Sequence, residues 1–212
     1  MLKYFAIRFF LLLVCITVII LSPSSKHKRT IEPVKPQEVY DVINTVIKER
    51  RLDTTCWDPN WPLRLMRELW KIDVNFPEPK LKSDTTKHER SGGTIDYTEL
   101  LTTVFSREDS AFFAYQNIHN DKFILQPGKI KLINLMSDSA FIKSQFTNKR
   151  YSEISFSIPI FSLDHQKAWI GAMGPWEYYL VKTNDRWRIK IIKKRWAMAG
   201  EPEHVETEVL FQ

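Results

Sequence analysis

The sequence predicts an α+β protein in which an N-terminal transmembrane helix is followed by two or three helices packed on a C-terminal four-stranded antiparallel meander. Three observations support this prediction. Residues 4–22 are almost entirely apolar, residues 36–52 repeat apolar side chains at helical spacing, and residues 153–196 alternate apolar and polar side chains between short turns. With 43% hydrophobic and 26% charged residues, the chain has the composition of a folded protein.

The N-terminal segment has two main interpretations. Residues 9–21 carry no charge, and extension across Arg8 to Tyr4 gives about the 20 residues that cross a bilayer. A retained signal-anchor would cover residues 1–24 and cross the membrane with residues 4–22, whereas a secretory signal would be cleaved after Ser24. A lipid-modified Cys15 is a third option, but the residue before it is too large for a lipobox. We expect the retained anchor.

The anchor sets the expected compartment. A short N-terminal tail usually stays in the cytoplasm, so we expect a single-pass protein of the inner (cytoplasmic) membrane with its soluble domain in the periplasm. A cleaved signal would instead give a secreted or periplasmic protein. Cys56 is the only cysteine after the membrane segment, so an internal disulfide is excluded and the fold depends on its apolar core.

The chain divides into four parts, of which the anchor is the first. Residues 25–35 are basic and contain proline, which is typical of a semi-extended tether. Residues 36–200 have the length of one soluble α+β domain. The last residues, EVLFQ, resemble the remnant of a site for a picornaviral 3C-type protease. We therefore interpret residues 207–212 as the scar of a cleaved tag and leave them out of the predicted fold.

Several segments of the domain are predicted helices. Residues 36–52 begin with proline and carry apolar residues on one stripe. A second helix is expected to start at Asn60 and to bury the apolar side chains of residues 63–70. A third starts at Ser106 with a variant capping box, and residues 97–105 before it are also expected to be helical. Residues 73–94, with two prolines and a glycine pair, are expected to form a long, partner-binding loop.

The C-terminal third is predicted to form the meander. Its four strands cover residues 153–161, 167–173, 176–182 and 187–196. In the last strand, Trp187, Ile189 and Ile191 are expected to face the core, with basic residues on the outer face. The formal net charge of +6 suits an acidic partner. We therefore predict a partner-binding surface on the last strand and the long loop, formed by Arg186, Arg188, Lys190, Lys193, Lys194, Lys87 and Arg90.

Two parts of the C-terminal half follow a known pattern. FSREDSAFFAYQ starts the third helix, and SFSIPIFSLDHQKAWIG precedes YYLVKTNDRWRI. These stretches resemble uncharacterised cell-envelope proteins and lipoproteins of the Bacteroidota, which share a Pro-x-Phe-Ser-x-Asp hairpin and a Lys-x-x-x-x-Trp strand. The resemblance implies no catalytic residues. It implies that Pro159, Phe161, Ser162 and Asp164 shape a turn, in which Ser162 or Asp164 binds local backbone amides.

The sequence lacks the motifs of common enzymes. It contains no G-x-S-x-G, H-E-x-x-H or Walker-type motif and no zinc-type spacing of Cys or His. The best acid or base candidates are Asp164, His165 and His119, and we expect each to be an exposed turn residue. Nucleic acid is not an expected partner, because strand alternation separates Trp187 from the basic face. We expect no catalytic residue, no metal and no cofactor.

Together these observations predict a membrane-anchored periplasmic protein that binds another envelope protein, as a non-enzymatic accessory subunit of an envelope complex. Two alternatives stay open. An immunity-type protein that neutralises a toxin would have a concave, charged surface. An envelope hydrolase would have a deep pocket with a perturbed acid or base. The sequence leaves the partner and the oligomeric state open.

Overall fold

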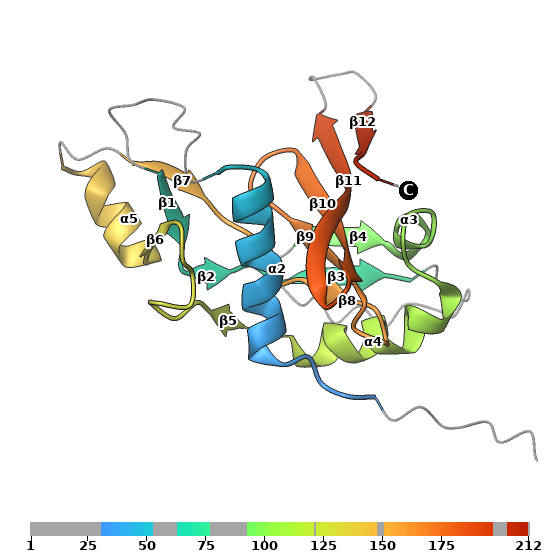
Figure 1. Ribbon diagram of the computed structural model, residues 1–212. Helices are drawn as coiled ribbons and strands as arrows, with labels where there is room; N and C mark the ends of the chain where they lie inside the picture. The colour runs from blue at the N-terminus through green and yellow to red at the C-terminus, as the bar shows by residue number, and fades with distance from the viewer. Residues whose placement is uncertain are drawn as a thin grey trace, which may run out of the picture. The chain divides into compact units, whose positions relative to one another are not determined.

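A five-stranded antiparallel sheet forms the C-terminal part of the fold, with strand order β12-β11-β10-β9-β8 (Figure 1). The computed structural model describes residues 31–52, 63–76, 93–120, 122–147, 151–196 and 203–211. The strands are β8 (Ile160–Phe161), β9 (Lys167–Gly171), β10 (Trp176–Thr183), β11 (Arg186–Trp196) and β12 (His204–Val209). The predicted α+β class with a C-terminal antiparallel sheet is confirmed, and the sheet has a fifth strand beyond residue 200.

The first predicted strand of the meander is divided between two sheets. Its beginning forms β7 (Ser152–Ile154), which pairs in parallel with β1. Only its last two residues join the meander as β8. Pro159 lies directly before β8, and a proline has no N–H for a ladder hydrogen bond. The chain between β7 and β8 makes isolated bridges instead of a continuous ladder.

A β-bulge between β10 and β11 changes which side chains face the core. Tyr179 lies opposite Ile191, but Leu180 lies opposite Ile189, so Lys190 is an extra residue in β11. Because side chains alternate along each strand, the two isoleucines point to opposite faces of the sheet. The prediction that they share one face is therefore wrong.

The helix α2 (Pro36–Glu49) packs against β11 (Figure 1), and the side chains of its apolar stripe are buried. Its first turn contains Pro36, and the Lys35 N–H donates to the Glu38 carboxylate over 3.1 Å. This helix is confirmed. Its buried side chains are Val39, Tyr40, Val42, Ile43, Val46 and Ile47.

The expected helix over residues 60–70 is wrong. Residues 63–69 form β1 (Leu63–Met66) and β2 (Glu68–Leu69) instead. The strand β1 lies between β6 (Asn134–Met136) and β7, parallel to both, and β2 pairs with β5 (Phe123–Ile124). The pattern of a short apolar run is compatible with a buried strand and with a helix. Residues 63–69 form strands because β5, β6 and β7 pair with them. Asn60, its expected cap, lies outside the described residues.

The ends of the expected long loop form strands. The strand β3 (Ile72–Asn75) pairs in parallel with β4 (Gly93–Asp96), and residues 77–92 lie outside the described part of the chain. After β4 come α3 (Tyr97–Leu101), the short 3-10 helix η1 (Arg107–Asp109) and α4 (Ser110–His119). Helices are therefore present in both expected places, although the first ends at Leu101 and not at residue 105. A further helix, α5 (Asp138–Gln145), joins β6 to β7.

One apolar core lies between the sheet and the segment from β3 to α4. Its members are Val74, Ile95, Leu100, Phe105, Phe113, Ile160, Trp169, Tyr179 and Ile191. Residues 32–212 form one unit. Within the described residues, no helix has the length and apolar composition needed to cross a membrane. The expected anchor, residues 1–24, lies outside the described residues.

Candidate functional site

A groove of about 930 Å³ opens between α2, the turn that follows β5, and the hairpin that joins β10 to β11. We call it the hairpin groove. Basic side chains outnumber acidic ones along its walls. The basic members are Lys48, Lys129, Lys131, Arg186 and Arg188, and the acidic members are Asp41, Glu49 and Asp185. This excess of positive charge favours an acidic ligand surface.

Two side chains of α2 hold the turn after β5 in place. The Asn44 amide donates to the Lys129 carbonyl over 3.0 Å and accepts from the Lys131 N–H over 3.2 Å. The Tyr40 hydroxyl accepts from the Gln126 N–H over 2.9 Å. These bonds fix the backbone that carries two lysines of the groove, so the wall is positioned by a helix.

A third α2 side chain fixes the other wall. The Glu49 carboxylate accepts from Arg188 Nε over 2.7 Å and from the Ile189 N–H over 2.9 Å. The Ile189 N–H thereby has an acceptor in a part of β11 that does not pair with β12, because that pairing begins at Ile191. A second hollow of about 640 Å³ shares Glu49, Arg186 and Arg188 with the groove.

The predicted basic residues fall into separate places. Arg186 and Arg188 are exposed and line the hairpin groove. Lys190 is the half-buried bulge residue, and its carbonyl accepts from the Leu210 N–H. Lys194 lies over the Trp176 ring at 5.4 Å. Lys87 and Arg90 lie outside the described residues.

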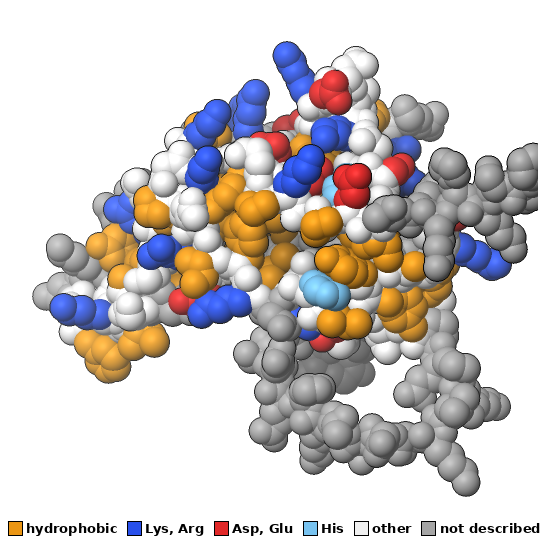
Figure 2. All heavy atoms as spheres, turned by 90° about the horizontal axis from the view of Figure 1, so that it is seen from below, with side chains coloured by type: hydrophobic (Ala, Val, Ile, Leu, Met, Phe, Trp, Pro, Cys, Tyr) orange, Lys and Arg blue, Asp and Glu red, His pale blue; other side chains and the backbone are white. Residues whose placement is uncertain are grey.

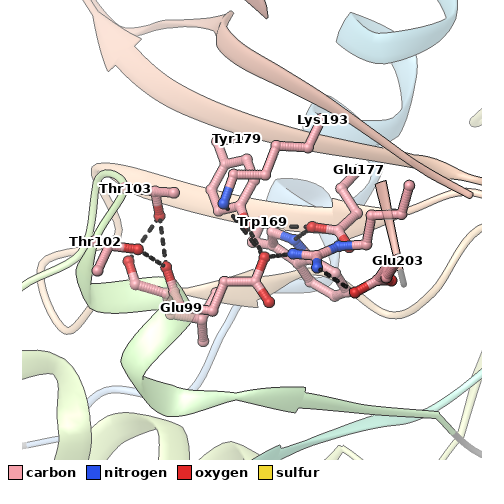
Figure 3. Close-up of polar contacts among 10 residues, drawn as sticks. Glu99, Thr102, Thr103, Trp169, Glu177, Tyr179, Lys193 and Glu203 are labelled. Carbon is pink, nitrogen blue, oxygen red and sulfur yellow. Dashed lines mark hydrogen bonds and ion pairs between the residues drawn. The ribbon is translucent and has the colours of Figure 1, made fainter. Parts of the chain in front are cut away.

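The expectation that Lys193 faces outward is wrong. Its side chain is buried on the core side of the sheet, 3.3 Å from Glu99 and 5.0 Å from the centroid of the Tyr179 ring (Figure 3). The bulge at Lys190 puts Lys193 on the Tyr179 face of the sheet, and the segment from β3 to α4 covers that face, so the side chain is buried. The predicted basic face is therefore divided between two faces.

Lys193 belongs to a charged cluster that links α3 to the sheet (Figure 3). Arg195 binds both Glu99 and Glu177, with 2.5 Å between its Nε and Glu177 Oε1. The Tyr179 hydroxyl lies 3.2 Å from Glu177 Oε2 and 3.4 Å from Glu99 Oε1. We call these five residues the charged cluster. Both of its carboxylates have cationic partners, so the cluster serves as an internal ion-pair network.

Burial shifts the ionisation of this cluster. It raises the pKa of Glu177, although hydrogen bonds from Trp169 and Tyr179 act in the opposite direction. Burial and the Glu177 charge raise the pKa of Tyr179, so its phenol stays neutral at physiological pH. Burial also lowers the pKa of Lys193, against the attraction of Glu177.

Ser162 and Asp164 form hydrogen bonds with each other and with the local backbone. The Ser162 hydroxyl donates to Asp164 Oδ1 over 2.6 Å and accepts from the Lys167 N–H over 2.9 Å. Asp164 Oδ1 also accepts from the Gln166 N–H over 3.0 Å. Phe161 is fully buried, with its N–H bound to the Gln116 side chain. The motif shapes a tight turn.

The three acid or base candidates lie in different settings. Asp164 and His119 are exposed, as expected. His165 is not, because its ring stacks on Phe112, with centroids 5.2 Å apart, and its Nδ1 lies 3.0 Å from the Glu38 carboxylate. The structure therefore does not bring the three candidates together as one site.

Sequence reasoning missed Glu99, Glu177, Tyr179 and Arg195, and it missed Lys129 and Lys131 as groove residues. No local signal reveals the cluster, because Glu99 lies on α3 and Arg195 lies at the end of β11. The Pro127-Gly128 turn was the one available signal for the groove, since it brings the following lysines to a bend. Comparison of the chain with protein-family models, curated proteins and solved structures found no match.

Proposed function

We propose that this protein is a non-enzymatic binding subunit that holds another protein of the cell envelope, with its N-terminal segment as a membrane anchor. The observation that carries the proposal is the hairpin groove, in which five basic side chains from three segments line one concave surface. A surface of this kind selects an acidic partner and accelerates its association.

The construction of the groove supports a binding role. Side chains of α2 form hydrogen bonds with the backbone of both walls, so the charged side chains extend from a backbone that is fixed before binding. Preformed surfaces lose less conformational entropy when they bind. Arg186 and Lys129 are exposed and make no ion pair within the described part of the chain, so both charges remain available.

Charge reversal in the groove tests the proposal. We would place a photo-crosslinking amino acid at Leu132, which lines the groove, in the full chain and identify its adducts in native membranes by mass. Lys129→Glu with Arg186→Glu should abolish the adduct to an acidic protein. Arg107→Glu with Lys122→Glu makes the same charge change at exposed positions elsewhere and should leave the adduct intact. Equal adducts in both variants would refute the proposal.

An immunity-type protein is the second candidate. The groove is concave and charged, which is what a toxin-neutralising surface requires. The two candidates differ in affinity and in consequence, because an immunity protein binds its toxin tightly and blocks its activity. A partner that loses a toxic activity on binding would favour this candidate over an accessory subunit.

A further inference from the structure

A second pocket, of about 600 Å³, lies between the parallel strands β1 and β6, the helix α5 and Pro127 of the turn after β5. It shares no lining residue with the hairpin groove. Among the described residues, its charged lining side chains are Arg64, Arg67 and Lys143, and no Asp or Glu of this part of the chain lines it. The volume is within the range of small-molecule sites.

The two arginines of this pocket are held in place by contacts that leave their charge uncompensated. The Arg64 guanidinium lies over the Tyr151 ring, 5.4 Å from its centroid. Arg67 Nε donates to the Leu125 carbonyl over 3.0 Å. Lys143 is exposed on α5. None of these three cations forms an ion pair with a carboxylate of the described residues.

Half-buried guanidinium groups that have no carboxylate partner among the described residues raise the local positive potential and thereby favour the binding of an anion. An arginine that stacks on an aromatic ring keeps its N–H donors at the edge of the guanidinium plane, where an oxyanion accepts them. Two guanidinium groups and one ammonium group suit an anion with several acceptor oxygens. A phosphate group has this chemistry.

Apolar side chains next to the pocket indicate what carries the phosphate. On α5, Ile142 is 58% exposed and Phe146 is 86% exposed. Figure 2 shows hydrophobic side chains beside basic ones at the left end of the molecule, where Figure 1 places α5. Exposed apolar residues beside cations are typical of surfaces that bind anionic lipids.

We propose that the pocket of Arg64, Arg67 and Lys143 binds a phosphate group, and that this phosphate is the headgroup phosphate of an anionic membrane lipid. The pocket would then hold the headgroup while Ile142 and Phe146 contact the acyl region. This site is independent of the protein-binding role proposed for the hairpin groove.

Calorimetric titration of the full chain in a neutral detergent tests this proposal. The probes are dihexanoyl phosphatidic acid, dihexanoyl phosphatidylcholine and inorganic phosphate. We expect Arg64→Gln with Lys143→Gln to weaken phosphatidic acid binding by about tenfold or more, because two charge-assisted contacts are lost. Arg107→Gln with Lys122→Gln removes the same charge at exposed positions outside both sites and should leave the affinity unchanged.

The probes separate the two sources of phosphate. Tight binding of phosphatidic acid and weak binding of inorganic phosphate supports the lipid. Equal affinity for both supports the phosphate pocket and overturns the lipid as its source. The whole proposal is overturned if neither anion binds, or if both double variants lose affinity equally. If the pocket variant loses its circular dichroism spectrum, Lys143→Glu alone, at an exposed position, must weaken binding instead.

Discussion

Asp109 shows how one side chain joins two segments of the fold. It is 4% exposed, and its Oδ2 accepts from the Ser106 N–H over 2.8 Å and from the Ser106 hydroxyl over 3.1 Å. Its Oδ1 accepts from the Leu163 N–H over 2.9 Å. The start of the third predicted helix is therefore bound to the turn of the Pro-x-Phe-Ser-x-Asp motif. Asp109 and Leu163, which are 54 positions apart in the sequence, are thereby in direct contact.

We expect Asp109→Ala to lower the free energy of unfolding by about 2 to 4 kcal/mol, because it leaves the part-buried N–H donors of Ser106 and Leu163 without their acceptor. Urea denaturation followed by tryptophan fluorescence measures the change. Arg107→Ala truncates an exposed side chain of the same turn and should change stability by about 0.5 kcal/mol or less. Equal losses in the two variants would contradict the role of Asp109.

Asp164 gives the molecule a contribution to stability that depends on pH. Partial burial raises the pKa of Asp164. Hydrogen bonds from Ser162 and the Gln166 N–H, together with the nearby charge of Lys167, lower it by more than burial raises it, so the net shift is downward. The native state then binds fewer protons than the unfolded state. The stabilisation is present above the ordinary pKa of about 4 and is lost as pH falls through the lower native pKa.

Asp164→Asn should therefore differ from the parent protein most near neutral pH. The difference in unfolding free energy between the two should shrink as pH falls below about 4, because the Asp164 carboxylate becomes protonated in both states. Denaturation curves at a series of pH values measure it. A difference that does not change with pH would show that the carboxylate charge has no part in the turn.

Among the whole elements, the strand β12 is bound to the sheet mainly through its backbone. It pairs with residues 191–196 of β11 in an antiparallel register, yet all six of its residues are exposed. Burial of its side chains therefore adds little to stability, and its contribution comes from backbone hydrogen bonds. It overlaps the segment interpreted as the scar of a cleaved tag, so its importance for the fold bears on that interpretation.

We expect removal of residues 204–212 to leave the protein folded and to lower the free energy of unfolding by about 2 kcal/mol or less. Hydrogen exchange measured by mass spectrometry should show faster exchange of amides in residues 191–196 and unchanged exchange in β9. Global unfolding of the shortened chain would mean that β12 is an integral strand, and the tag interpretation would then be wrong.

At the scale of the whole molecule, residues 32–212 form one unit with an apolar core. The two proposed binding places share no lining residue, although Pro127 in one and Gly128 in the other belong to the same turn. A membrane anchor before it would keep the lipid pocket near a bilayer and leave the hairpin groove for a protein partner. The two proposals are therefore compatible, although neither depends on the other.

The anchor is tested on the native protein. We expect the full chain to stay in the membrane fraction after carbonate extraction, because an apolar segment of about 20 residues holds it in the bilayer. The intact mass of the purified protein should include residues 1–24. A mature N-terminus at Ser25, with the protein released by carbonate, would support the cleaved signal instead.

The sequence by itself determined the elements whose signals are local. The apolar stripe of α2, the capping box at Ser106 and the turns between β9, β10 and β11 each involve residues close in the chain, so their preferences are visible without a structure. The Asn184-Asp185 turn, with positive φ at both residues, is an example.

Only the tertiary structure decided the features that depend on distant partners. β1 and β2 are strands because β6, β7 and β5 take up their backbone hydrogen bonds. Lys193 is buried because the bulge at Lys190 puts it on the Tyr179 face, which the segment from β3 to α4 covers, and the pairing of β10 with β11 sets that bulge. The charged cluster and both pockets likewise join residues far apart in the chain. Their geometry follows from packing, which a pattern of neighbouring residues does not contain.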